Sequence, residues 1–288
     1  MFQKINRRFV HENIENLKEH SWSFIFLTYI LYGSLLIFII FVIYQYDLLT
    51  FIQIQTFHLI QLTLLMSLLL FFLVVWLAII KIGKLSVREL GLKKEQLKGG
   101  ILFYLVLYLL LNLVLLLINL ISFGSPYYYP YWTERGLIYS IGALFAQIFG
   151  NVLVEEVYYR GYLLNQITGK FYNKNTGNNK AEFKSIFKGV VLSSTMFAFL
   201  HIPIRIFTGV LGLNLVLNIL LLIGIGVIIG LIYVFSTNLF FAMAVHVISN
   251  ISFVLFAPVG YLPFLSYGLS FLIIFCLIRL KYRSNPLE

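Results

Sequence analysis

The sequence predicts an all-α membrane protein that crosses the bilayer about eight times. Of its 288 residues, 60% are hydrophobic and 11% are charged, and the mean hydropathy is +0.93. A soluble domain carries roughly 25% charged residues. The apolar residues gather in runs that reach the ~20 residues a spanning helix needs. Many of the 28 Phe and 19 Tyr stand near the ends of these runs, as interfacial aromatic residues do.

Eight apolar runs follow one another and define the expected helices. The polar segment 1–21 precedes them and is expected to be an amphipathic helix on the cytoplasmic surface of the membrane, since it is too charged for a signal peptide. We expect one transmembrane domain over residues 1–288, without a soluble second domain. The eight runs are 22–44, 57–80, 101–121, 136–164, 187–207, 210–235, 239–256 and 261–280.

The basic residues predict the topology. Four precede the first run, six separate the second from the third, four separate the fourth from the fifth, and three lie at the C-terminal end. With Lys188 at the edge of the fifth run, about eighteen lie on one side, and the alternate loops contribute Arg135 and Arg205. Both termini are therefore expected in the cytoplasm. Because the basic residues flank spans, the net charge of +10 indicates contact with the bilayer and no nucleic-acid partner.

Cysteine, glycine and overall composition set further limits. The single Cys276 excludes an intramolecular disulfide framework and a multi-cysteine metal site. Gly226 and Gly230 form a GxxxG spacing that predicts close helix packing. Abundant Ile, Leu, Phe, Lys and Asn suggest an AT-rich bacterial genome, so we expect a multi-pass protein of a bacterial plasma membrane.

Three charged residues fall within six positions of the fourth run. Glu155, Glu156 and Arg160 each cost at least ~2.5–3.5 kcal/mol at membrane depth. Glu156 and Arg160 are four apart and share a helix face, where each neutralises the other. Glu155 points about 100° away, so we expect Glu156 to orient the site and Glu155 to be free. The roles exchange if Arg160 reaches Glu155 instead.

Two further spans carry histidines. His201 follows Phe197 by one turn, and Pro203 is expected to end or kink that helix. His246 and Asn250 share a face of the seventh run. Counted along the helices, Glu155 and His246 lie about 12–14 Å from the inner ends of their spans and His201 about 21 Å. A shared polar pocket would keep these side chains away from lipid.

Such a pocket is suited to hydrolysis. Glu155 with His201 and His246 can supply a general base and a polarising site. The same three residues could hold zinc as a His₂Glu site with an open water position. No HExxH motif is present, so the zincin arrangement is absent. The residues leave open whether the cavity uses zinc or water alone.

The three motifs resemble those of the CPBP intramembrane proteases, which include type II CAAX prenyl endopeptidases and bacteriocin-processing and Abi-like proteins. They are Glu-Glu-x-x-x-Arg from Glu155 to Arg160, Phe-x-x-x-His from Phe197 to His201, and His-x-x-x-Asn from His246 to Asn250. The resemblance covers residues 136–256, the expected catalytic core. It implies eight helices around a conical cavity that opens to the cytoplasm.

The resemblance also implies roles for the residues. Glu155 and His201 would activate water, and His246 and Asn250 would stabilise the oxyanion. Glu156, Arg160 and Phe197 would support the site. The expected activity is an intramembrane endopeptidase, of glutamate or metalloprotease type, acting on a peptide or membrane protein. Two alternatives stay open: a non-catalytic immunity or sensor-partner protein on the same fold, and a transporter with a proton relay.

Overall fold

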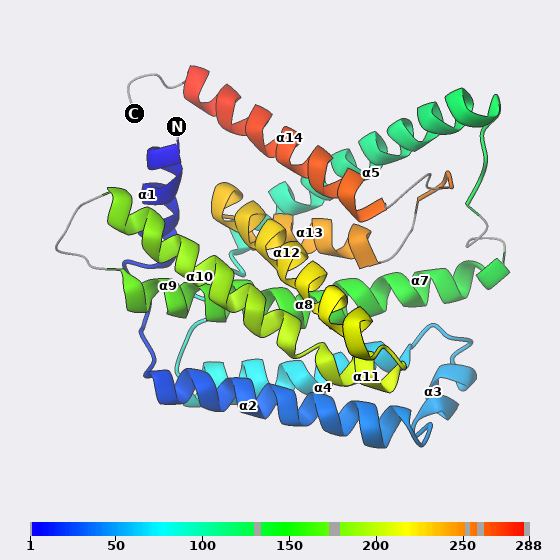
Figure 1. Ribbon diagram of the computed structural model, residues 1–288, viewed down its shortest axis with the longest axis horizontal. Helices are drawn as coiled ribbons and strands as arrows, with labels where there is room; N and C mark the ends of the chain where they lie inside the picture. Colours follow the sequence, from blue (N-terminus) through cyan, green and yellow to red (C-terminus); the bar gives the residue numbers. More distant parts are fainter. Residues whose placement is uncertain (1, 130–133, 173–178, 251–253, 258–261, 285–288) are drawn as a thin grey trace.

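The computed structural model describes residues 2–129, 134–172, 179–250, 254–257 and 262–284 (Figure 1). These residues form a bundle of helices, and their one β contact is an isolated bridge between Tyr128 and Phe256. The predicted all-α class is confirmed. Within the described ranges, six helices are long and apolar enough to cross a membrane, and two shorter apolar helices accompany them.

The first half of the chain supplies three of the long helices. The second begins at Leu62 rather than near residue 57, because Phe57 and His58 adopt positive φ angles of 51° and 65° and interrupt the helix. Wide π-helical turns, whose hydrogen bonds run from i to i+5, extend two of the helices. The elements are α1 (Phe2–Asn13), α2 (Trp22–Phe38), η1 (Ile39–Tyr44), α3 (Thr50–Gln55), α4 (Leu62–Leu70), η2 (Phe71–Ile82) and α5 (Lys94–Phe123).

The second half carries the motifs. One run of 35 residues, Leu137–Phe171, passes through five alternating α and π segments and extends seven residues beyond the predicted end at 164. Residue 261, the predicted start of the last span, lies outside the described ranges. The elements are α7 (Leu137–Phe145), η3 (Ala146–Asn151), α8 (Val152–Glu155), η4 (Glu156–Leu164), α9 (Asn165–Phe171), α10 (Asn179–Phe199), α11 (Ile202–Phe207), α12 (Gly212–Ser236), α13 (Leu239–Asn250) and α14 (Leu262–Ser284).

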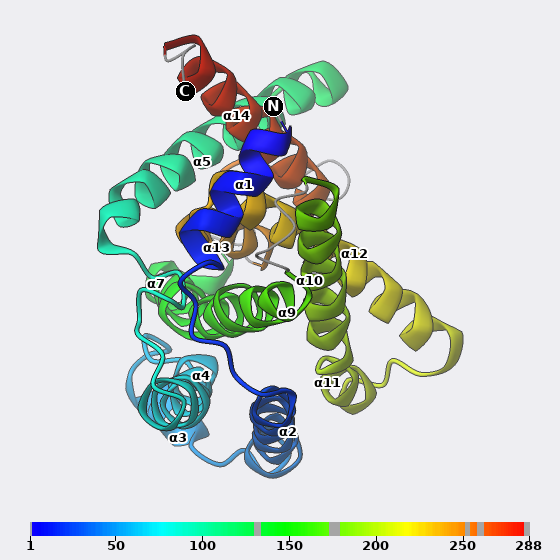
Figure 2. The ribbon, with the colours of Figure 1, turned by 90° about the vertical axis from the view of Figure 1, so that its left-hand side faces the viewer.

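The 35-residue run is the centre of the bundle. Two perpendicular views show α2 and α4 on one side of it and α5 and α14 on the other (Figure 1, Figure 2). All nine residues of η4 are buried, including Arg160. Glu156 and Arg160 are therefore enclosed by the bundle, which removes the cost of exposing these charges to lipid.

Close packing joins α10 to α12. A Cβ placed on Gly226 would lie 2.9 Å from the Ser194 Cβ, and one on Gly230 would lie 3.2 Å from Val190. The absence of a side chain at these two positions lets the helices approach. The packing predicted from the GxxxG spacing is confirmed.

The N-terminal helix differs from its expected placement. Ile5, Phe9, Val10 and Ile14 are buried on one side of α1 and its end, and α1 packs against α10 and α12. The segment is amphipathic as expected, but its apolar face lies on the bundle rather than on lipid. The charges of its other face join a basic end of the molecule.

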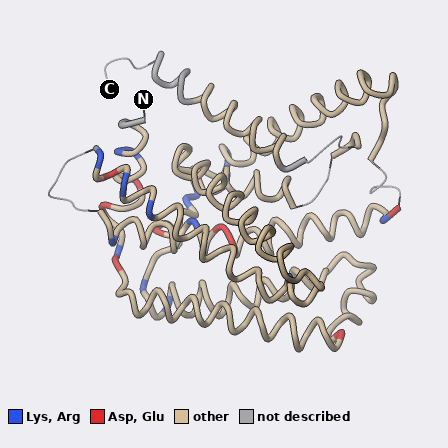
Figure 3. Tube along the Cα trace, in the orientation of Figure 1, with Lys and Arg blue, Asp and Glu red and all other residues tan. Residues whose placement is uncertain are grey.

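Charge is distributed unevenly between the two ends of the bundle. Lys and Arg gather at the end that carries α1, α9 and the start of α10, while few charged residues lie at the end with α3 and α11 (Figure 3). The asymmetry counted along the sequence is therefore present in three dimensions. Assignment of the basic end to the cytoplasm stays a prediction.

Candidate active site

The two glutamates meet different partners although they are adjacent. Glu156 Oε1 accepts a hydrogen bond from Arg160 Nη1 at 2.9 Å, and both side chains are buried. The Arg160 guanidinium also lies 4.9 Å from the centre of the Phe197 ring, and Nη2 is 3.4 Å from the Gly226 carbonyl oxygen. The expected Glu156–Arg160 pair is present, so Glu155 has no guanidinium partner within the described residues.

Two histidines from other helices flank the carboxylates. His246 Nδ1 lies 2.7 Å from Glu156 Oε1, and His246 Nε2 lies 3.5 Å from Glu155 Oε2. His201 Nε2 lies 3.9 Å from Glu155 Oε1. The structure thus brings Glu155, His201 and His246 together from three spans. His246 bridges both glutamates, a contact that the sequence pattern does not reveal.

An interruption between two helices sets the position of His201. Helix α10 ends at Phe199, and α11 begins at Ile202 with Pro203 in its first turn, so the predicted interruption is confirmed. His201 lies in the intervening turn, and its Nδ1 donates to the Phe197 carbonyl oxygen at 2.9 Å. This bond places the proton on Nδ1 and leaves the Nε2 lone pair toward Glu155.

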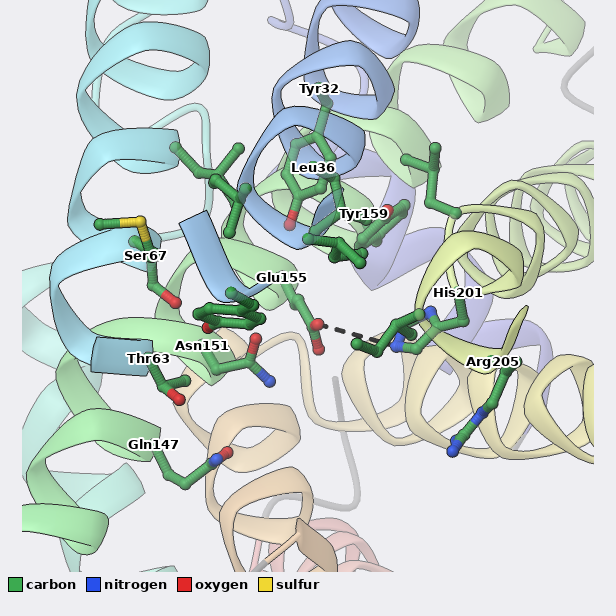
Figure 4. Close-up of a pocket in the computed structure, with 17 residues that line it drawn as sticks. Tyr32, Leu36, Thr63, Ser67, Gln147, Asn151, Glu155, Tyr159, His201 and Arg205 are labelled. Carbon is green, nitrogen blue, oxygen red and sulfur yellow. Dashed lines mark ion pairs between the residues drawn. The ribbon is translucent and has the colours of Figure 1, made fainter. Parts of the chain in front are cut away.

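Two cavities meet at these residues. The larger has a volume of about 310 Å³ and the smaller about 160 Å³, and both are lined by Asn151, Glu155, His201 and Arg205. His246 and Asn250 line the smaller one. Figure 4 shows Glu155 and His201 directed toward each other at the edge of the larger cavity. The site is therefore open to a molecule larger than water.

The larger cavity lies between several helices. Its lining includes Tyr32 of α2, Tyr44 at the end of η1, Thr63 at the start of α4, and Ile204 and Arg205 of α11. The side of the membrane toward which it opens stays a prediction.

Asn250 lies at the rim of the site. Its side chain is exposed, and Nδ2 donates to Gln147 Oε1 at 3.0 Å. Gln147 and Asn151 line the larger cavity with Glu155 and were not singled out from the sequence. Their spacing in the sequence could have identified them. Gln147, Asn151 and Glu155 recur every four positions and so share one face of the central run.

Two buried carboxylate oxygens of the site have no hydrogen-bond partner among the described residues. They are Glu155 Oε2 and Glu156 Oε2. Buried polar atoms are nearly always bonded to protein or to ordered water. Glu155 lies in the cavity wall with an exposed fraction of 7%, so a small polar molecule can reach this carboxylate.

The donor set bears on the zinc hypothesis. Across the described part of the chain, no group of three or more His, Cys, Asp or Glu side chains is arranged to hold a metal ion. Nδ1 of His201 contacts the Phe197 carbonyl oxygen and Nδ1 of His246 contacts Glu156, which leaves Nε2 of both rings toward Glu155. Zinc binding by Glu155, His201 and His246 stays a prediction.

Comparison with known protein families gives a match over the region of the motifs. Residues 138–252 match the family model described as Rce1-like, type II CAAX prenyl endopeptidase. The comparisons with curated proteins and with solved structures give no match. The matched segment contains all three motifs, from Glu155 to Asn250. The resemblance predicted from those motifs is confirmed, and at the family level it indicates a CAAX-type intramembrane protease.

Proposed function

We propose that this chain, whose residues 138–252 match the type II CAAX prenyl endopeptidases, is an endopeptidase that hydrolyses a peptide bond with water activated by Glu155 and His201. One observation carries the proposal: the buried Glu155 carboxylate, with an unpartnered oxygen, lies between two imidazoles in the wall of both cavities. A carboxylate so placed is suited to take a proton from water.

The gap between Glu155 and His201 fits a bridging water. Their facing atoms are 3.9 Å apart, which is too long for a direct hydrogen bond and short enough for one water to contact both. That water donates one hydrogen to Glu155 and the other to the Nε2 lone pair of His201. Its oxygen lone pairs then point away from both residues, toward a substrate carbonyl carbon in the cavity.

Glu155 accepts a proton from the attacking water and later returns it. As the water oxygen forms a bond to the carbonyl carbon, its proton passes to Glu155 and the carbonyl oxygen becomes an oxyanion. When the carbon–nitrogen bond breaks, Glu155 returns the proton to the departing amine. The products are a carboxylic acid and an amine, and Glu155 regains its charge.

His246 and Asn250 are the proposed donors to the oxyanion. His246 Nδ1 donates to Glu156 Oε1, which leaves Nε2 at the smaller cavity and 3.5 Å from Glu155 Oε2. In the proposed role a proton on Nε2 is donated to the oxyanion, while Arg160 balances the charge of Glu156. Asn250 uses one amide hydrogen on Gln147 and keeps the other for substrate. Glu156 and Arg160 thus hold the ring of His246.

The proposed substrate is an apolar peptide or a segment of a membrane protein. The larger cavity is lined mostly by aromatic and aliphatic side chains around a few polar groups, as substrate clefts commonly are. A prenylated CAAX protein is less consistent with the bacterial composition than a leader-bearing peptide or a pheromone precursor. The proposed location is a bacterial plasma membrane.

Purified protein in detergent, incubated with a quenched fluorescent peptide library, tests the activity. We expect Glu155→Gln and His201→Ala each to lower kcat by about 10²- to 10⁴-fold, because each removes a partner of the attacking water. Glu134→Gln, an exposed carboxylate outside both cavities, is the matched control and should retain wild-type rates. Thermal unfolding of each variant verifies that it folds.

Other outcomes decide between the alternatives. Wild-type rates in both active-site variants contradict the endopeptidase. Retention of the cellular phenotype by these variants favours the binding or regulatory protein. Activity lost to a chelator and restored by zinc supports a metalloprotease, whereas unchanged activity supports water activated by Glu155 alone.

A further inference from the structure

Arg205 has no role in the proposed hydrolysis, yet it lines both cavities beside the reacting groups. It follows His201 by four residues across the start of α11, so the two side chains share one face. Figure 4 shows the Arg205 guanidinium on the cavity side of His201. In the sequence, Arg205 contributes only to the predicted topology, because it stands outside the three motifs.

The guanidinium of Arg205 lacks a counter-charge. No ion pair or side-chain hydrogen bond to it exists within the described residues, and its Nε is buried without a partner. Nε–H is one of the five N–H donors of an arginine, and leaving a buried donor unsatisfied is costly. By contrast, Arg160 pairs with Glu156, Arg88 with Glu95, and Arg8 with Glu12.

The charges of the site do not supply that partner. Glu156 is occupied by Arg160 and His246, and Glu155 faces the two histidines. Arg205 therefore presents an unpaired cation to a cavity whose wall is otherwise mostly apolar, with Leu36 and Ile204 among its residues. This combination suits a hydrophobic peptide that bears one carboxylate, which a guanidinium can hold with two parallel hydrogen bonds.

We propose that Arg205 forms a carboxylate-binding subsite that selects and positions the peptide substrate. The inference rests on the proposed function and adds a substrate class to it: peptides with a carboxylate near the scissile bond. That carboxylate is either the C-terminal one or an Asp or Glu side chain. Both share the same chemistry toward a guanidinium, and substrate variants separate them.

The test compares matched substrates on matched variants. The peptide that wild-type protein cleaves best is made as a free acid, as a C-terminal amide, and with each acidic residue replaced by its amide. In Arg205→Gln, kcat/KM for the carboxylate peptide should fall about 10- to 100-fold, the range of a charged hydrogen bond, with the larger change in KM. The peptide lacking that carboxylate should lose little.

The pattern of substrate loss identifies the bound group. Loss on amidation of the C-terminus assigns the terminal carboxylate, and loss on Glu-to-Gln replacement assigns a side chain. Arg205→Lys should recover part of the rate, because lysine keeps the charge and loses the paired geometry. Arg135→Gln is the control, since Arg135 stacks on Tyr139 and lines neither of the two cavities.

Two results overturn the inference while the proposed function stands. One is Arg205→Gln cleaving carboxylate peptides at wild-type rates. The other is an equal loss on carboxylate and amide peptides, which indicates a purely structural arginine. If wild-type protein and Glu155→Gln are equally inactive on every peptide, the proposed function itself fails and the subsite falls with it.

Discussion

Glu156 holds a guanidinium and an imidazole on the same oxygen while fully buried. The stability that the Glu156–Arg160 pair contributes can be measured by removing one of the two side chains. Glu156→Gln leaves Arg160 buried without its counter-charge, which costs about 3–5 kcal/mol. We expect a clearly lower Tm in detergent. Glu156→Gln combined with Arg160→Met should recover much of that loss, since no unpaired charge is left.

The control for this prediction is an exposed pair of the same spacing. Arg8 and Glu12 bond at 2.7 Å, with side chains 42% and 28% exposed. Arg8→Met should cost no more than about 1 kcal/mol. A Tm for Glu156→Gln that matches that of Arg8→Met contradicts the account of the buried pair.

His20 gives the protein a dependence on pH at its basic end. The ring is buried before α2, with Nε2 2.9 Å from the Gly83 carbonyl oxygen and Nδ1 3.1 Å from the Tyr162 hydroxyl. Burial lowers the pKa of His20, against the opposing effect of the Gly83 carbonyl. The folded state therefore keeps the ring neutral, and the unfolded chain takes up a proton more readily.

The sign of this effect follows from linkage. The stability contributed by His20 is complete above the unfolded pKa of about 6.5 and is lost as pH falls through it toward the lower folded pKa. We expect Tm to decline between pH 7 and pH 5, and His20→Gln to make that decline shallower. His11→Gln, at an exposed position on α1, is the control. An unchanged slope in His20→Gln contradicts this assignment.

At the residue scale, sequence reasoning succeeded where helical spacing sets the contact. The Glu156–Arg160 pair and the shared pocket of Glu155, His201 and His246 follow from charges that need partners inside a membrane. The depth count did not foresee that His201 and Glu155 face each other at 3.9 Å, because it ignores the tilt of α10 (Figure 1). Arg205 was missed because a cation near a span end also serves topology.

At the element scale, the central run depends on one close approach. Gly161 follows Arg160 in η4, and a Cβ placed there would clash with the backbone carbonyl of Leu90. We expect Gly161→Ala to destabilise the protein by about 1–3 kcal/mol, because the backbone of the facing segment must move. Thermal unfolding in detergent measures the effect.

Gly224 offers the matched control on another helix. It lies within α12, and nothing lies within 4 Å of a Cβ placed on it. Gly224→Ala should leave Tm unchanged or slightly raised, since alanine favours helix. Equal Tm values for the two alanine variants contradict the packing of Gly161 on Leu90.

Helix boundaries were predicted well where a change from polar to apolar residues sets them. They were predicted poorly where a local backbone conformation interrupts the helix. Helix α2 with η1 matches the predicted 22–44 range, which is a plain apolar run. The second span starts five residues late because Phe57 and His58 adopt positive φ, which periodicity does not encode. The π-helical turns of the central run were not foreseen either, because an apolar run carries no signal for a local change of pitch.

At the scale of the whole molecule, the asymmetry of charge predicts a single orientation. In a Cys276→Ser background, a membrane-impermeant maleimide should label Glu134→Cys in intact cells. It should label Glu95→Cys only after the membrane is permeabilised, because basic loops remain inside. The reverse pattern would place both termini outside and contradict the predicted topology.

Helix α1 is synthesised before the helices on which it packs. Helix α1 packs on α10 and α12, and its end is held by a hydrogen bond from the Tyr233 hydroxyl to Asn13 Oδ1 at 3.2 Å. The ribosome delivers those helices only after four long spans have been made. The buried face of α1, including Phe9, therefore cannot be covered by these helices until α12 has been made.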